Sequence, residues 1–155
     1  MLGGSDMIGS RCGTYSLILS CRTSPIIQVG RLGGLRLQPG FYVYVGSALG
    51  PGGIAARVAH HERVTPRPRW HIDYLRAHTQ LGQVWYTCDP VRREHQWADV
   101  FKQARGASIP MAGFGSSDCS CMSHLFRFET RPSLGSFWRR LGTTGMPPVK
   151  HLVIT

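Results

Sequence analysis

Two tyrosines, an arginine and a histidine stand in three short motifs whose side chains could move protons and bind anions. The first motif is Gly13-Thr14-Tyr15 and the second is Tyr44-Val45-Gly46. In the third motif Arg57 precedes His61 by four residues, a spacing that places both side chains on one face of a helix. These residue types suit chemistry on a charged substrate, because phenol and imidazole groups exchange protons and a guanidinium binds anions.

The charge of the chain indicates what such a site would act on. Eighteen Lys and Arg residues face eight Asp and Glu residues, which gives a formal net charge of +10. Lys102 and Lys150 are the only lysines, and the planar guanidinium of arginine suits phosphate recognition and base stacking better than an ammonium does. A phosphodiester backbone is therefore the first partner to consider. The alternative is that the charge only keeps a small basic protein in solution.

Length and composition indicate one compact domain in a reducing compartment. The chain has 155 residues, 42% of them hydrophobic, which is enough for a core of its own. Its start resembles no signal peptide, and the longest apolar stretches are too short to span a bilayer. The odd number of cysteines, five, argues against a disulfide framework. We therefore expect a soluble, cytoplasmic protein with no membrane partner.

The pattern of apolar residues and turn formers predicts a mixed α/β (α+β) fold, with a small, mainly antiparallel sheet flanked by helices. Pro39-Gly40 and Gly50-Pro51-Gly52-Gly53 are strong breaks between elements. Strands are expected over Thr14–Cys21, Ile26–Val29, Phe41–Gly46, Val84–Thr87 and His124–Phe128. Helices are predicted over Ile54–Glu62, Trp70–His78, Val91–Arg105 and Leu134–Leu141. A Pro-containing tail is expected after the last of them.

The order Gly-x-Tyr, Tyr-x-Gly and Arg-x-x-x-His resembles the GIY-YIG nuclease superfamily. The longer segments 42–53, 70–75 and 113–126 are similar to hallmark segments of its Uri-type endonuclease branch. With the motifs, they cover nearly all of the chain from Gly13 to about Phe128. The resemblance implies a GIY-YIG-like nuclease domain over 13–130, with a flexible N-terminal segment at 1–12 and a basic C-terminal helix and tail at 131–155.

The resemblance also implies catalytic roles for the motif residues. Tyr15 and Tyr44 match the two family tyrosines that line the site, one of which helps to deprotonate the attacking water. A free phenol has a pKa of about 10, so it needs a cation or a metal to act as a base. Arg57 matches the arginine that clamps the scissile phosphate, and His61 matches a helix position from which an imidazole could relay a proton or bind phosphate.

The family holds one divalent cation with a glutamate on a later helix, and Glu94 is the match in this chain. Glu94 follows the strand expected at Val84–Thr87 and lies on the same helical stripe as Trp97 and Phe101. An inward carboxylate is costly unless it is paired or bound to metal. Mg2+ is the expected cofactor, or Mn2+ in its place, because oxygen ligands suit hard cations. The alternatives are that Glu94 pairs with Arg92 or Arg93, or that it stabilises the helix start through the helix dipole.

Further residues are expected to contact nucleic acid. Ser47 stands where some relatives carry a lysine, and His71 is a polar residue within an aromatic segment. Arg139 and Arg140 lie beside Trp138 in a basic, aromatic patch that could equally be an exposed helix end. The sequence departs from the common family spacing by three additional residues between the second motif and Arg57, but the resemblance to the Uri-type pattern includes this longer spacing, so the assignment of Arg57 stands.

Several neighbours of the motif residues have simpler interpretations. Tyr42 shares a sheet face with Tyr44 and could be the packing residue of the two. His60 is adjacent to His61, but only His61 lies on the stripe of Arg57. Trp70 and Tyr74, four residues apart, are expected in the core rather than as a stacking platform for bases.

The loop Gly113–His124 contains small residues, an acid, two thiols and an imidazole. A structural role is favoured, with Asp118 capping turns and the cysteines packed as small apolar groups. The alternative is a zinc site made by Cys119, Cys121 and His124, with Cys88 as a further ligand.

These observations predict a metal-dependent endonuclease that hydrolyses phosphodiester bonds in DNA, with RNA not excluded. So small a catalytic unit has little surface for reading sequence. Its specificity could come from DNA structure, from single-strandedness or from a larger repair or nuclease partner. One alternative is a non-catalytic nucleic-acid-binding module that retains the fold. Another is a metal-sensing or scaffold protein built around the cysteine loop. The oligomeric state is left open.

Overall fold

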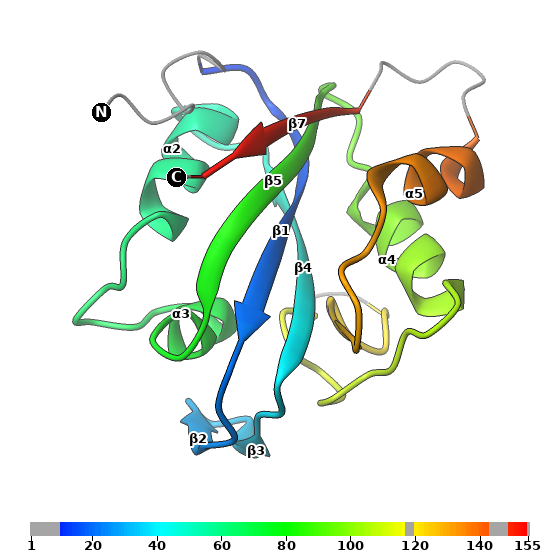
Figure 1. Cartoon of the computed structure of the whole chain (residues 1–155). Coiled ribbons are helices and arrows are strands. Elements are labelled where there is room, and N and C mark those ends of the chain that lie inside the picture. Colours follow the sequence, from blue (N-terminus) through cyan, green and yellow to red (C-terminus); the bar gives the residue numbers. More distant parts are fainter. Residues whose placement is uncertain (1–9, 117–119, 143–148, 155) are drawn as a thin grey trace.

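The computed structural model describes residues 10–116, 120–142 and 149–154. Figure 1 shows a central sheet with helices on both sides. The strands and helices, in chain order, are β1 (Gly13–Cys21), β2 (Ile26–Val29), β3 (Gly33–Arg36), β4 (Gly40–Ala48), α2 (Gly53–His61), α3 (His71–Arg76), β5 (Gln80–Cys88), α4 (Glu94–Gln103), β6 (Leu125–Phe128), α5 (Leu134–Leu141) and β7 (Lys150–Val153).

The central sheet is antiparallel throughout and has the strand order β6-β4-β1-β5-β7. The hairpin β2-β3 forms a separate two-stranded sheet. The predicted α+β class with a mainly antiparallel sheet is thereby confirmed. The long strands β1 and β4 are paired along their whole length, with Tyr15 opposite Gly46. This register places the first two sequence motifs side by side at one end of the sheet.

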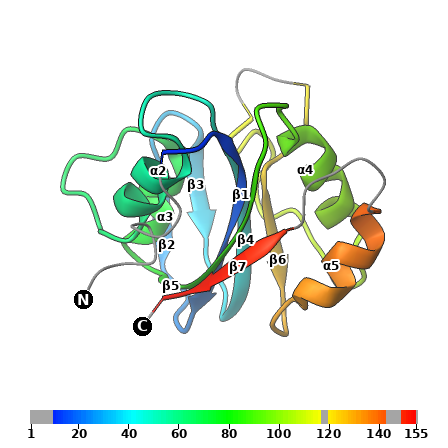
Figure 2. The ribbon, with the colours of Figure 1, turned by 90° about the horizontal axis from the view of Figure 1, so that it is seen from above.

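Each face of the sheet carries its own hydrophobic core. Figure 2 shows α2 and α3 on one side of the sheet and α4 and α5 on the other. Along β1, Tyr15 and Leu17 belong to the core that contains Ile54 of α2, whereas Ile18 belongs to the core that contains Phe101 of α4. Successive side chains of a strand point to opposite faces, which explains how one strand serves both layers.

The last strand corrects the expectation of a tail at the C-terminal end. Lys150–Val153 pairs with β5, with Tyr86 opposite Lys150 and Gln83 opposite Val153. The segment is short and follows two prolines, so its sequence alone carries little strand signal. It becomes a strand because the edge of β5 offers unpaired backbone groups. Helix α5 packs on α4, where Phe137 stacks on Phe101 with 4.4 Å between ring centroids, and on the sheet, where Phe137 lies 5.6 Å from the ring of Trp85 in β5.

Candidate active site

A cavity of about 300 Å3 opens at the end of the sheet where the two tyrosine motifs meet. We call it the tyrosine cavity. Its walls come from β1, β4, α2, α3, α4 and the three loops that precede α3, α4 and β6. The lining residues are Tyr15, Tyr44, Gly46, Ser47, Arg57, Arg69, Trp70, His71, Arg92, Glu94, Gly115 and His124. Most of the residues predicted to form a site are therefore gathered in one place.

The two motif glycines are needed because neighbouring groups approach them closely. A Cβ on Gly46 would lie 2.6 Å from the hydroxyl oxygen of Tyr15, on the paired strand. A Cβ on Gly13 would overlap the carbonyl oxygen of Thr87 in β5. Gly46 thus makes room for the Tyr15 hydroxyl, and Gly13 allows β1 to lie against β5.

Tyr15 forms a buried hydrogen bond with the histidine of the third motif. Its hydroxyl oxygen lies 2.8 Å from Nε2 of His61, and both side chains are almost completely buried. The ring of His61 also lies 6.2 Å from that of Tyr44, edge to face. Arg76 of α3 donates a hydrogen bond of 2.7 Å to the carbonyl of His61, which ties the end of α2 to α3. Of the two adjacent histidines, His61 is therefore the one that bonds to a motif tyrosine.

Burial determines the protonation states of these groups. Desolvation, reinforced by the nearby His60, lowers the pKa of His61 to about 3, although Asp73 opposes the shift. Desolvation also raises the pKa of Tyr15 and of Tyr44 above the ordinary value, and the Arg57 guanidinium opposes both shifts. At neutral pH the site therefore contains two neutral phenols and a neutral imidazole.

Arg57 lies over the ring of Trp70, with 4.4 Å between its guanidinium carbon and the ring centroid. Arg69 lies over the same ring at 5.8 Å. Trp70 packs against the hydrophobic core, as predicted, but it is only partly buried and also lines the tyrosine cavity. Trp70 thus serves the core and the cavity at once, and a cation–π contact with its ring holds the Arg57 side chain at the cavity wall.

Asp73 fixes the segment that carries this tryptophan. Its carboxylate accepts hydrogen bonds from the backbone N–H groups of Arg69 and Trp70, at 2.9 and 3.0 Å. Nε2 of His60 lies 2.8 Å from the other carboxylate oxygen. Although burial favours the neutral acid, these hydrogen bonds hold the pKa of Asp73 below its ordinary value. The aspartate thus positions Arg69 and Trp70 and does not itself line the cavity.

His71 joins the helical side of the cavity to the loop before β6. The backbone N–H of Gly115 donates a hydrogen bond of 2.8 Å to Nδ1 of His71. Desolvation lowers the pKa of this imidazole, which suits its role as an acceptor. His71 lines the cavity as well, together with Ser47. Both residues are placed where they could meet a substrate, and their predicted contacts with nucleic acid stay predictions.

Glu94 is the first residue of α4 and lines the tyrosine cavity. Its side chain is 14% exposed, and its carboxylate lies 3.7 Å from Nη1 of Arg92 and 3.5 Å from Nδ1 of His124. The backbone N–H of Arg93 donates to Oγ1 of Thr14, at 3.1 Å, so the first motif also holds the start of α4. The side chain of Arg93 pairs with Asp89 instead. The carboxylate is thus both partly paired and accessible from the cavity.

Three predicted residues do not line this cavity. His61 is buried and contacts the lining residue Tyr15, whereas the two arginines of α5 lie elsewhere. Arg140 donates a hydrogen bond to the carbonyl of Gln103 and lines a separate cavity between α4 and α5. Arg139 donates to Ser136 within α5. Their predicted contacts with nucleic acid would therefore be made away from the tyrosine cavity.

Tyr42 behaves as the packing residue of its pair. Its side chain is fully buried in the core, and its hydroxyl accepts a hydrogen bond of 2.9 Å from the backbone N–H of Gln38.

Arg69, Arg92 and His124 are cavity residues that the sequence did not assign to this site. A Pro- and Arg-rich segment before Trp70 was the only signal for Arg69. In the cysteine loop, Cys121 and His124 lie close together, but the residue that joins them is His95 of α4. Asp118, which is predicted to cap a turn, and Cys119, a ligand of the alternative zinc site, lie outside the described residues.

The sequence model of one protein family, which is described as a domain of unknown function (DUF123), matches residues 14–144. Since the match covers most of the chain, the protein belongs to this family. No curated protein and no solved structure matches the chain significantly. Within the described residues, no helix combines the length and the apolar character that a membrane span requires.

Proposed function

We propose that this protein is a metal-dependent endonuclease of the GIY-YIG type, similar to the Uri branch, that hydrolyses phosphodiester bonds in DNA. One observation carries the proposal. Tyr15, Tyr44, Arg57 and Glu94 come from β1, β4, α2 and α4, and all four line a single cavity. A fold does not imply a function, but a convergence of proton-transferring, phosphate-binding and metal-binding groups supports one.

The sequence motifs and the family support the same proposal. The family to which the chain belongs is GIY-YIG-like, although its function is unknown. The structure explains why glycine stands in both tyrosine motifs: Gly13 allows β1 to approach β5, and Gly46 leaves space for the Tyr15 hydroxyl. The net charge of +10 supports a polyanionic substrate.

The donor groups in the cavity fit a single Mg2+ or Mn2+ ion. Mg2+ is commonly bound by one or two carboxylates and completed by water and substrate phosphates. Glu94 is the one carboxylate among the described lining residues of the tyrosine cavity, and its partial exposure leaves it accessible. When bound there, the ion would neutralise charge that develops on the phosphate oxygens.

Tyr15 and His61 form a path for a proton. Because both groups are neutral, the Tyr15 hydroxyl can donate to Nε2 of His61 while its oxygen accepts a hydrogen bond from the attacking water. As water attacks, the water proton passes to the phenolic oxygen and the phenolic proton passes to the imidazole. An anionic phosphate in the cavity favours the imidazolium that results, so substrate binding prepares the pair for this transfer.

Arg57 is the group best placed to hold the phosphate. Its side chain lines the cavity and is ordered by Trp70, so its guanidinium is presented without a large loss of side-chain entropy on binding. Arg69 and Arg92 line the same cavity and extend its positive charge. Ser47 and His71 lie on the wall where neighbouring nucleotides would pass.

The test is a cleavage assay with labelled single-stranded, duplex and branched DNA, in the presence of Mg2+, Mn2+ or EDTA. Arg57→Ala is compared with Arg22→Ala, which removes an exposed arginine just beyond the far end of β1. We expect metal-dependent cutting that EDTA abolishes and that Arg57→Ala lowers by at least about 100-fold, because loss of a charged contact to the transition state costs about 3 kcal/mol.

The control Arg22→Ala should cut at the wild-type rate. Salt-sensitive binding with no cutting of any DNA would instead favour a non-catalytic nucleic-acid-binding module. Equal loss in both arginine variants would show that only overall charge matters, which would contradict the role of Arg57.

A further inference from the structure

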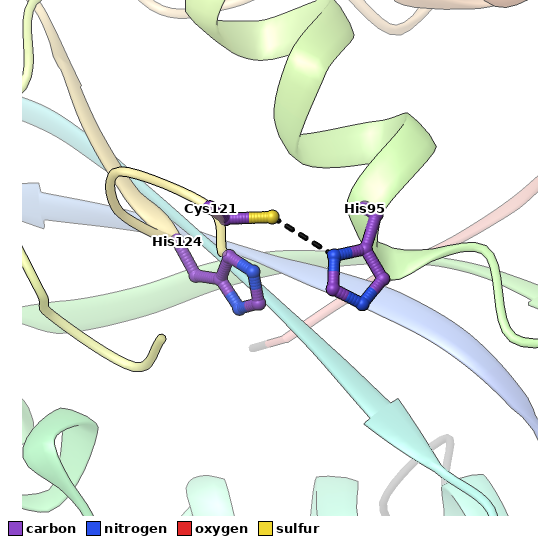
Figure 3. A group of neighbouring side chains, drawn as sticks. All are labelled: His95, Cys121 and His124. Atoms are coloured by element: carbon purple, nitrogen blue, oxygen red, sulfur yellow. Dashed lines mark hydrogen bonds between the residues drawn. The ribbon is translucent and has the colours of Figure 1, made fainter. Parts of the chain in front are cut away.

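A second group of metal-ligating side chains lies beside the tyrosine cavity, where the first turn of α4 meets the loop before β6. It consists of His95, Cys121 and His124, and one donor atom from each lies within 4.8 Å of those of the other two. Figure 3 shows the thiol and the two imidazoles gathered around one common space. Nδ1 of His95 lies 2.9 Å from Sγ of Cys121.

We propose that His95, Cys121 and His124 bind a transition-metal cation, with Zn2+ as the expected ion, at a site distinct from the Glu94 carboxylate. A tetrahedral zinc ion with a Zn–S bond of about 2.3 Å and Zn–N bonds of about 2.0 Å holds sulfur and nitrogen ligands about 3.5 Å apart. The donor separations, from 2.9 Å to at most 4.8 Å, bracket that value. Side-chain movements of about 1 Å would therefore bring all three donors to bonding distance.

The backbone that carries these ligands is held in place independently of any metal. The backbone N–H of His124 donates a hydrogen bond to the carbonyl of Phe114 at 2.8 Å, and the carbonyl of His124 accepts one from the N–H of Val45 in β4 at 3.0 Å. The carbonyl of Met122, next to Cys121, accepts from Gly113 at 2.7 Å. His95 lies in the first turn of α4. Ligands on such supported segments lose little entropy when they bind an ion.

The donor chemistry separates this site from the magnesium site of the proposed nuclease. A thiolate and imidazoles select zinc and similar ions, whereas Mg2+ prefers oxygen. Nδ1 of His124 lies 3.5 Å from the Glu94 carboxylate, so an ion bound through Nε2 would leave Nδ1 facing that carboxylate. A carboxylate beside the other ring nitrogen is a common support for a ligating imidazole. The ion would fasten the loop to the start of α4 and thereby fix Glu94 at the cavity.

This ligand set differs from the one that the sequence suggested. Cys121 and His124 are retained, His95 joins them from a helix 26 residues before the cysteine, and Cys88 of β5 is not part of the cluster. Cys88 is therefore a suitable control, because a nonspecific thiol–metal interaction would depend on it as much as on Cys121.

The test is a titration of metal-free protein with Co2+, which replaces zinc and gives a thiolate-to-metal charge-transfer band. We expect saturation at one ion per chain, a band that excess Mg2+ does not remove, and displacement of Co2+ by Zn2+. Cys121→Ser should abolish the band, and His95→Ala should weaken Co2+ binding by at least about tenfold. Cys88→Ser should bind as the wild type does. Circular dichroism checks that each variant is folded.

Absence of a saturable band in the wild type would overturn the proposal. So would a band that survives in Cys121→Ser, or one that His95→Ala leaves unchanged. The titration needs no DNA and no cutting, so its result does not depend on whether the nuclease proposal holds.

Discussion

The buried pair of Tyr15 and His61 leads to a specific prediction about acid sensitivity. The pKa of His61 is lowered to about 3, mainly by desolvation, whereas the unfolded chain has the ordinary value of about 6.5. Between these values the unfolded state binds a proton that the folded state does not, so folding stability falls as the pH falls below about 6.5. From pH 7 to pH 5 the loss is about 1.5 pH units at about 1.4 kcal/mol each, or about 2 kcal/mol.

Urea unfolding at pH 7 and pH 5 measures this loss. With an m-value of about 2 kcal/mol/M, the midpoint should fall by about 1 M in the wild type. His61→Gln removes the titrating group, so its midpoint should fall much less over the same interval, whatever its stability at pH 7. Contributions from Asp73 and Asp89, whose pKa values lie below the ordinary range, are lost mainly at lower pH and are common to both proteins.

His78→Gln is the matched control, because it removes an exposed histidine near the end of α3. Its dependence on pH should equal that of the wild type. If His61→Gln and the wild type lose the same free energy between pH 7 and pH 5, His61 is not held neutral by burial and the proton path described above is incorrect.

Three further predictions concern the tyrosines. Tyr15→Phe leaves buried His61 without its hydroxyl partner. The substitution should therefore lower the unfolding free energy, measured by urea unfolding, by about 1–3 kcal/mol. It should also lower the cleavage rate, measured by single-turnover cutting, by about 100-fold or more. Tyr42→Phe should cost about 1 kcal/mol of stability and leave cleavage unchanged, because its hydroxyl lies in the core, where it accepts a hydrogen bond from the backbone of Gln38. A large loss of cutting would contradict this assignment. Gly46→Ala should slow cutting more than Gly34→Ala does, since only the first substitution displaces the Tyr15 hydroxyl; equal rates would refute the close-approach argument.

The sequence predicted most of the strands and the positions of the two tyrosine motifs within them, because these features depend on residues that are close together in the sequence. Alternating apolar residues fix which side chains of β1 and β4 face each core, and the two tyrosine motifs stand at fixed positions within those strands. The helical spacing of Arg57 and His61 places both on one face of α2, from which Arg57 lines the cavity and His61 contacts Tyr15.

Features that depend on contacts between distant segments were not predictable in this way. Trp70 both packs against the core and lines the cavity, where Arg57 lies over its ring. The number of residues between Arg57 and Trp70 in the sequence does not predict that contact. His95 meets Cys121 because the loop before β6 folds back on the start of α4. Strand β7 forms because the edge of β5 is available, although its own sequence carries little strand signal.

The central claim is that Glu94 serves catalysis from within the tyrosine cavity. Its most direct test measures cutting and binding together for Glu94→Gln on one labelled DNA with Mg2+, and Glu129→Gln, which changes an exposed glutamate, is the control. The proposed function predicts that Glu94→Gln binds DNA as tightly as the wild type does but cuts at least about 100-fold more slowly, while Glu129→Gln is unchanged. Cutting by Glu94→Gln at the wild-type rate would contradict it.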